Sequence, residues 1–353
     1  MNFIIQIVYF IFLLGIIVLI HELGHFISAK RFGVYCGEFS IGMGPVLFKK
    51  QVKETQYSIR LLPIGGFVSM AGEEDDTKKD ENIPFERTIN GIKTYKKIII
   101  MSAGIVMNIV LAWVIFVGLN IASGERALPL APQFAIVQEG TIAEDAGFEE
   151  GDIIESIAFE DGSIEKIDTF DDIVTAINYN PGKAVFQVNR NGEKLDISLT
   201  PVYDKAAEVY RIGVAAPAPE FEDISILEAF QYGTNDLIES STSLFDSLGR
   251  IFRGKNLDQL SGPVGIFKVS AQAAQSGFST YLRLLAILSI NIGVMNALPL
   301  PVLDGGRVLI TIIEKIMGRK LNEKVMGILM WGGVLALVFL MVFATFNDVL
   351  KLF

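Results

Sequence analysis

Two histidines and a glutamate, close together near the amino terminus, have the types and spacing to bind and use a metal ion. His21 and His25 are the two histidines of the 353-residue chain, and Glu22 follows the first of them. On a helix, positions i and i+4 share one face, so both imidazoles can reach the same ion. A glutamate beside them is the residue type that takes a proton from water activated by zinc. The pattern predicts half of a zinc site with Glu22 as general base, against the alternative of two histidines on a helix surface.

Apolar helices are the elements that must position this site. A mean hydropathy of +0.44 with 51% hydrophobic residues is too apolar for an ordinary soluble protein, yet 20% charged residues is too polar for a chain lying entirely in a membrane. A cleaved signal peptide is the alternative for the first apolar stretch, but no basic residue precedes it and no small-residue cleavage site follows it. Four stretches are long enough to cross about 30 Å of hydrocarbon, and they cover residues 3–29, 98–121, 281–312 with a break, and 325–346.

The distribution of Lys and Arg predicts the orientation of these spans. Residues 30–97 hold 12 Lys and Arg, and the loop at 313–324 adds four more. Both segments are therefore expected on the cytoplasmic side. The segment 122–280 carries 26 Asp and Glu against 11 Lys and Arg, a net charge of −15. We expect this segment outside, together with both termini, and the histidines toward the cytoplasmic side.

A carboxylate is expected as the third zinc ligand, because a catalytic zinc usually takes three protein ligands and the chain has no further histidine. Asp304 lies in the third span, where Pro299 and Pro301 should break the helix. The first and third spans are expected to run in the same direction, so Asp304 should lie on the same side of the membrane as the histidines. The amides of Asn296 and Asn291 could hold substrate backbone or a developing oxyanion, or satisfy carbonyls freed by the prolines. We favour the substrate role for Asn296 and leave both roles open for Asn291.

Glycine-rich segments between the first two spans alternate apolar and polar residues. They predict two β-hairpin-like segments, residues 34–48 and 56–70. We expect both to tuck back beside the catalytic helix, since irregular backbone at membrane depth needs cover from protein or water. A free strand edge there could pair with an unwound substrate segment. An ordinary cytoplasmic hairpin that covers the site is the alternative.

The loop after these segments and the second span have sequence features that predict solvent exposure and helix packing. Residues 72–90 are polar and charged and predict a solvated loop. Gly104 and Asn108 lie four residues apart on one face of the second span. Small residues allow close helix packing, and an Asn amide can hydrogen-bond across helices. We favour packing over chemistry for this face.

The external segment divides into two parts. Residues 122–219 contain short apolar strands separated by turns, with a helix at 170–177, and predict one small α+β domain. Residues 220–280 have apolar residues at helical spacing and predict amphipathic helices on the outer membrane face. The remaining parts are residues 1–121, with the first two spans, and 281–353, with the last two.

Several motifs occur together and in order along the chain. They are HELGH at 21–25, LPIGGFV at 62–68, AG at 103–104 with Asn108, GTIAEDAG and GDII at 140–154, SGPVG at 261–265, and NALPLPVLDGG at 296–306. The combination resembles the bacterial site-2 proteases of the regulator-of-sigma-E protease type, over nearly the whole chain. The run at 140–154 resembles a bacterial PDZ domain, a module that captures chain ends or extended segments by strand addition.

The resemblance implies a multi-pass α-helical membrane protein with four transmembrane helices, membrane-associated β-hairpin segments and one extracytoplasmic α+β PDZ-like domain. It implies an intramembrane zinc metalloendopeptidase of the bacterial cytoplasmic (inner) membrane. Family substrates include anti-sigma factors, after a first external cut, and remnant signal peptides. The PDZ-like domain would screen the external part of a substrate. The expected partners are transmembrane protein substrates and membrane lipid, with no nucleic acid.

The resemblance also assigns roles to individual residues. By the family pattern the zinc ligands are His21, His25 and Asp304, the general base is Glu22, and the substrate-contacting asparagines are Asn291 and Asn296. The chain departs from the family in having one PDZ-like module where well-known members have two. It also has Ile105 where the family often has proline after Ala-Gly.

Two rival functions remain at this point. In a metal transporter, intramembrane His and Asp residues mark an ion path, but such residues are usually spread along the path and here they converge with a base. A membrane-anchored PDZ scaffold without catalysis leaves Glu22 and Asp304 with no reason to lie in apolar segments. Metal flux in vesicles would test the first rival, and a Glu22→Gln variant the second.

Overall fold

The computed structural model describes residues 2–73, 83–204, 207, 209–253 and 262–350. The chain divides into two units, of which the first contains residues 1–122 and 226–353 and the second is Ser123–Ser225. Residues 74–82 of the loop predicted at 72–90, together with Ser261 of the SGPVG motif, lie outside the described residues.

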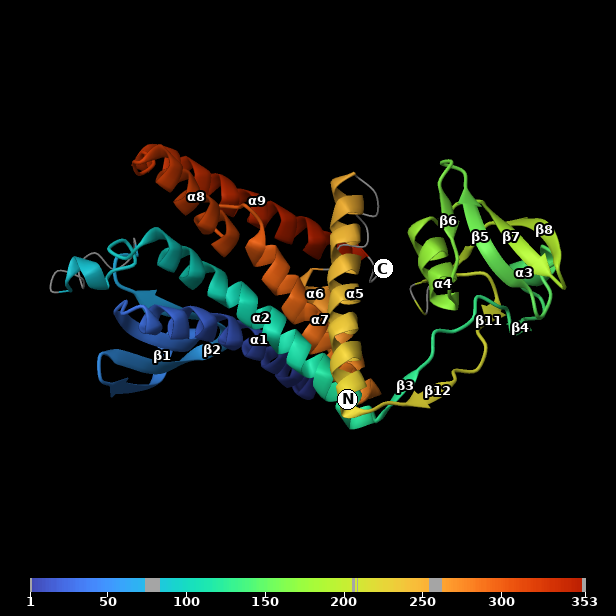
Figure 1. The fold of residues 1–353 in the computed structure, drawn as a ribbon, viewed down its shortest axis with the longest axis horizontal. Helices are drawn as coiled ribbons and strands as arrows, with labels where there is room; N and C mark the ends of the chain where they lie inside the picture. Colours follow the sequence, from blue (N-terminus) through green and yellow to red (C-terminus); the bar gives the residue numbers. More distant parts are fainter. Residues whose placement is uncertain (1, 74–82, 205–206, 208, 254–261, 351–353) are drawn as a thin grey trace. The chain divides into compact units, whose positions relative to one another are not determined.

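Four helices of the described chain are long and apolar enough to cross a membrane, which confirms the predicted number of spans. They are α1 (Phe3–Arg31), α2 (Thr94–Ser123), α7 (Phe278–Ala297) and α9 (Glu323–Leu350), labelled in Figure 1. These apolar runs contain no proline, so each helix satisfies its own backbone hydrogen bonds, as hydrocarbon requires. Lys30 and Arg31 lie in the last turn of α1, at the negative end of its dipole. The chain is therefore a membrane protein.

The third predicted span is broken at its prolines, as expected. α7 ends at Ala297 and α8 (Asp304–Met317) follows. Pro299 and Pro301 lie between them, and a proline nitrogen has no hydrogen with which to continue a helix. The turn is tight, because a Cβ atom on Gly305 would lie only 2.1 Å from the carbonyl oxygen of Ala297. The first residue of α8 is thereby held against the end of α7.

One bent β-sheet, and not two separate hairpins, connects α1 to α2. β1 (Cys36–Val52) pairs antiparallel with β2 (Thr55–Met70). Residues 38–41 find partners in both halves of β2, at 56–59 and at 66–69. The predicted turns are present, but the prediction of two hairpins that each pair with themselves is wrong, because each strand bends and pairs with the other.

Glycines permit these bends, and the sheet packs on the first helix. Gly42 and Gly65 both have φ of 85°, a conformation that side chains with a Cβ atom rarely adopt. β2 lies along α1. Both elements contribute, together with β1, α2 and the segments beside them, to a buried core made of Ala29, Val34, Cys36, Phe39, Val68, Met70, Ile89 and Ile100. A short 3₁₀ helix, η2 (Phe85–Arg87), precedes α2.

Two further helices complete the first unit. α6 (Pro263–Ser276) packs against α1, α7 and α9, and α5 (Ile226–Phe252) packs against α7. Leu237 and Leu244 of α5 contact a buried cluster from α2 and α7. Both segments are helical, and their position at the membrane surface stays a prediction.

The second unit is a small α+β fold. Its antiparallel sheet has the strand order β6-β5-β7-β8. α4 (Phe170–Tyr179) begins with a capping box at Thr169 and adds Ile173 to a core that contains Phe134 and Phe186. The sheet strands are β5 (Ile153–Phe159), β6 (Ile164–Lys166), β7 (Ala184–Arg190) and β8 (Glu193–Leu199). The shorter elements are β3 (Glu125–Ala127), β4 (Ile136–Val137), α3 (Ile142–Asp145), β9 (Val202–Asp204), β10 (Val209–Arg211), β11 (Val214–Ala215) and β12 (Phe221–Asp223).

Candidate metal centre

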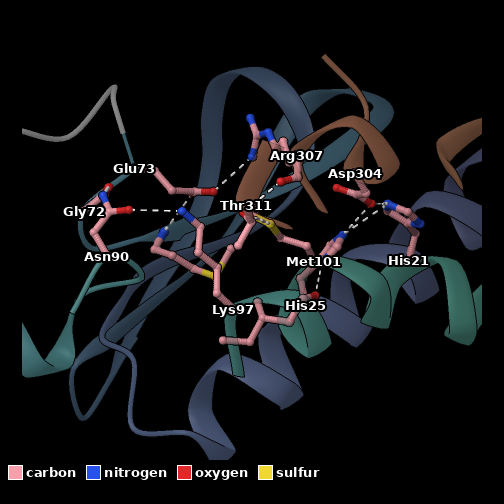
Figure 2. A network of polar contacts seen from close by, with 12 residues as sticks. His21, His25, Gly72, Glu73, Asn90, Lys97, Met101, Asp304, Arg307 and Thr311 are labelled. Carbon is pink, nitrogen blue, oxygen red and sulfur yellow. Dashed lines mark hydrogen bonds and ion pairs between the residues drawn. The ribbon is translucent and has the colours of Figure 1, made fainter. Parts of the chain in front are cut away.

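α1 places two imidazoles on one face. His21 and His25 are one turn apart and nearly buried, with 8% and 7% of their surfaces exposed. Their Nε2 atoms lie 3.2 Å apart. Asp304, the first residue of α8, places Oδ2 3.1 Å from His21 Nε2 and 3.2 Å from His25 Nε2 (Figure 2). Three residues predicted as ligands from distant parts of the sequence are therefore in contact.

The donor atoms and their spacing fit a zinc ion. Neighbouring ligand atoms in a tetrahedral site, each about 2.0 Å from zinc, lie about 3.3 Å apart, close to the three distances observed here. Oδ2 of Asp304 is buried and has no hydrogen bond, as expected for an atom whose partner is a cation. Two imidazoles and one carboxylate are a ligand set of catalytic zinc sites, which keep one position open for water. His21, His25 and Asp304 could hold such an ion.

α2 lies directly against the two imidazoles. His25 Nδ1 is 2.7 Å from the carbonyl oxygen of Ile100 and donates its hydrogen to it when Nε2 faces a metal. Gly104 faces both rings, because a Cβ atom there would lie 2.4 Å from His25 Nε2 and 2.7 Å from His21 Cε1. Asn108 is fully buried and its Nδ2 lies 3.4 Å from His21 Nδ1.

These contacts of α2 are the part of the site that the sequence did not predict. The spacing of Gly104 and Asn108 was a signal that this face packs closely, but not that it packs on the histidines. The prediction of a packing role for Asn108 is therefore incomplete, since its amide contacts a candidate ligand.

A cavity of about 1360 Å³ opens beside the three candidate ligands. Glu22 lines it together with His21 and with residues 65–70 of β2. A Cβ atom on Gly66 would lie 3.6 Å from Glu22 Cγ, so this half of β2 runs beside the predicted base. The cavity is thus lined both by this half of β2 and by the three candidate ligands.

The two asparagines of α7 differ in position. Among the described residues, the wall of the cavity includes Asn296 but not Asn291. Asn291 is half-buried within α7, more than one helical turn before the helix ends at Ala297. This placement is compatible with the role favoured for Asn296 and gives no support to a substrate contact by Asn291.

An ion pair joins the end of the β-sheet to α8 (Figure 2). Oε1 of Glu73, just after β2, lies 3.2 Å from a guanidinium nitrogen of Arg307. Burial raises the pKa of Glu73, and the positive charge of Arg307 opposes that rise. Arg307 lies in the first turn of α8, so the pair ties the helix that carries Asp304 to the strand that lines the cavity.

Known proteins resemble this chain along almost its whole length. The sequence model of peptidase family M50 matches residues 9–340, a range that begins before the histidines and ends after Asp304. A Clostridium acetobutylicum protein named as a candidate zinc metalloprotease is 36% identical over 95% of this chain and 94% of its own length. Zinc metalloprotease RasP of Shouchella clausii is 32% identical, over 98% of both chains.

A further relative is the Regulator of sigma-W protease RasP of Bacillus subtilis, which is 31% identical over 99% of this chain and 100% of its own length. The match extends over 431 aligned residues, more than the 353 residues present here. That relative therefore contains inserted residues that this chain lacks.

Proposed function

Because this chain belongs to peptidase family M50, the site-2 protease family, and is a zinc metalloprotease, we propose that it hydrolyses peptide bonds inside transmembrane segments of other membrane proteins. One observation carries the proposal. The three candidate ligands converge to within 3.2 Å at the carboxyl-terminal half of an apolar helix that is long enough to cross a membrane. A protease site in that position meets chains that are themselves in the membrane.

The proposed ligands are His21, His25 and Asp304, and the proposed general base is Glu22. Zinc, when bound, supplies Lewis-acid chemistry that activates water and polarises a peptide carbonyl. Glu22 faces the same cavity as the ligands and is suited to accept a proton from the attacking water and to deliver it to the leaving amine. The carbonyl of Ile100, bound to His25 Nδ1 at 2.7 Å, orients that ring.

Substrate binding is proposed to use the strand edge beside Glu22. A membrane-buried helix must unwind before it can be cut, because its carbonyls are occupied by its own hydrogen bonds. An unwound segment can add as a strand to a sheet edge, and residues 65–70 of β2 line the cavity that contains the base. Asn296, which also lines this cavity, is proposed to hold substrate backbone or the developing oxyanion.

The external module and the substrate class are proposed from the sequence pattern and the relatives. We place the chain in the bacterial cytoplasmic membrane with both termini outside and the site toward the cytoplasm, as the Lys and Arg distribution indicates. Residues 122–219 would form a PDZ-like domain that screens the external part of substrates. The Bacillus subtilis relative is named as a regulator of sigma-W, which favours anti-sigma-factor-like substrates after a first external cut, with remnant signal peptides as the second class.

The site of cleavage tests this function. Purified protein is incubated in detergent with a single-span test substrate, and the products are identified by mass spectrometry. We expect cuts inside the apolar segment, and faster cutting of a substrate with a central Gly-Pro than of a matched all-Leu span. Cuts confined to the polar flanks of the substrate would contradict intramembrane cleavage.

A further inference from the structure

Three residues on one face of α2 surround the two imidazoles. Ile100, Gly104 and Asn108 are spaced four apart, so they lie one above the other along the helix. The carbonyl of Ile100 contacts His25 Nδ1, Gly104 leaves room for both rings, and the amide of Asn108 contacts His21 Nδ1. In each histidine, Nδ1, the nitrogen that does not contact Asp304, thus lies next to a polar group of α2.

The contact at Asn108 has the wrong hydrogen-bonding groups for a ligand histidine. A neutral imidazole carries one hydrogen, and if Nε2 of His21 faces a metal that hydrogen is on Nδ1. The group 3.4 Å from Nδ1 is Asn108 Nδ2, which is also a donor. Meanwhile Oδ1 of the same amide is buried and has no hydrogen-bond partner. Two donors therefore face each other while an acceptor is left unpaired.

A half-turn of the amide removes both defects. Oxygen and nitrogen of an Asn side chain have nearly the same shape, and the hydrogen-bond network decides which is which. After the turn, Oδ1 of Asn108 accepts the hydrogen of His21 Nδ1. The NH₂ group of a buried Asn can be satisfied within this helix, since Nδ2 of Asn120 donates to the carbonyl of Phe116 at 2.9 Å.

We propose that Asn108 is the positioning residue of His21: its amide oxygen accepts the Nδ1 hydrogen and holds the ring with Nε2 toward the metal. The proposal rests on the proposed ligand set. It makes α2 the support of both ligands, through a main-chain carbonyl for His25 and through a side chain for His21. Acceptors of this kind fix the tautomer of ligand histidines and typically change metal affinity 10- to 100-fold.

Zinc affinity, measured apart from activity, tests the proposal. Full-length protein in detergent is titrated with a competing chelator to obtain the zinc dissociation constant. Asn108→Leu, which keeps the volume and removes the acceptor, should weaken zinc binding about 10- to 100-fold. Asn108→Asp, which keeps an acceptor, should bind zinc at least as tightly as the wild type. The matched control is Asn120→Leu, a buried Asn of the same helix that is bonded to Asp236, and it should leave zinc affinity unchanged.

A second measurement reads the tautomer and does not depend on the Leu variant folding. The chain has two histidines, so protein labelled with ¹⁵N-histidine gives signals from two rings only. The proposal expects Nδ1 of His21 to carry the hydrogen, and expects Asn108→Asp to shift that signal while the His25 signal stays in place. A hydrogen on His21 Nε2, or equal zinc affinity in Asn108→Leu and wild type, would overturn the role of Asn108. If Asp304→Ala also keeps full zinc affinity, the proposed ligand set is wrong. This variant therefore distinguishes failure of the ligand set from failure of the role of Asn108 alone.

Discussion

Replacing Gly104 by alanine tests whether α2 packs on the imidazoles as closely as the structure has it. The added Cβ atom would lie 2.4 Å from His25 Nε2 and 2.7 Å from His21 Cε1, where unstrained contacts are about 3.5 Å. Both rings must therefore move by about 1 Å, or α1 and α2 must separate. Overpacking of this kind costs about 1–3 kcal/mol, and the better helix propensity of alanine returns about 1 kcal/mol. The net loss of stability should be small, about 0–2 kcal/mol.

The loss of zinc binding should be much larger than the loss of stability. Zinc sites tolerate errors of only about 0.2 Å in ligand distance, so a ring displaced by about 1 Å is a poor ligand. We expect Gly104→Ala to bind zinc at least about 10-fold more weakly, the smallest loss typical of changes outside the ligands themselves. Proteolysis should fall with zinc content.

A second glycine of α2 provides the control. A Cβ atom on Gly118 would have no neighbour within 4 Å, so Gly118→Ala should keep zinc and gain up to about 1 kcal/mol of stability from helix propensity. Zinc content, chelator competition and thermal unfolding in detergent are measured for both variants. Equal zinc affinity in Gly104→Ala and Gly118→Ala would refute the close packing of α2 on the histidines.

Two further predictions concern ion pairs outside the site. Asp152 in the second unit is fully buried and accepts from Arg190 at 2.7 and 2.9 Å, so Asp152→Ala should cost about 3 kcal/mol, as breaking buried pairs does. Hydrogen exchange of residues 123–225 measures this loss of stability, and amide protection equal to that of the wild type would contradict the prediction. The hydrogen bond from Lys30 lowers the pKa of Glu54 below its ordinary value of 4.5. The ion pair therefore stabilises the fold fully at pH values above 4.5, and this stabilisation is lost as the pH falls through the lowered pKa. The difference in melting temperature between wild type and Glu54→Gln should shrink on acidification, and a constant difference would refute the coupling.

Local signals made the helices and the ligands predictable from sequence. The four spans follow from long apolar runs, and the break before α8 follows from Pro299 and Pro301, because both effects depend on the chain near each residue. The contact of His21 and His25 with Asp304 also could be foreseen, since the chain offers only two histidines and the direction of the spans selects the carboxylate. Membership of the family and the zinc cofactor agree with the resemblance that these motifs suggested, and they remove the support for a transporter or a scaffold.

Apart from the contact of the histidines with Asp304, contacts between distant elements were not predictable. Residues 38–41 of β1 pair with both halves of β2, and alternation along a strand does not say which strand is its neighbour. The small-residue face of α2 indicated close packing, but the identity of the facing helix depends on tertiary structure. The ion pair of Glu73 with Arg307 joins residues 234 positions apart, and a single charged residue in a polar segment carries no sequence signal of its partner.

Zinc content and cleavage in two single variants test the central claim most directly. Glu22→Gln keeps the three candidate ligands and removes the base, so it should retain zinc and cut nothing. Asp304→Ala removes one ligand, whose Oδ2 lies 3.1 and 3.2 Å from the two imidazoles, so it should lose both zinc and cleavage. Cleavage by Glu22→Gln at the wild-type rate would contradict the assignment of the base, and full zinc content in Asp304→Ala would contradict the metal centre.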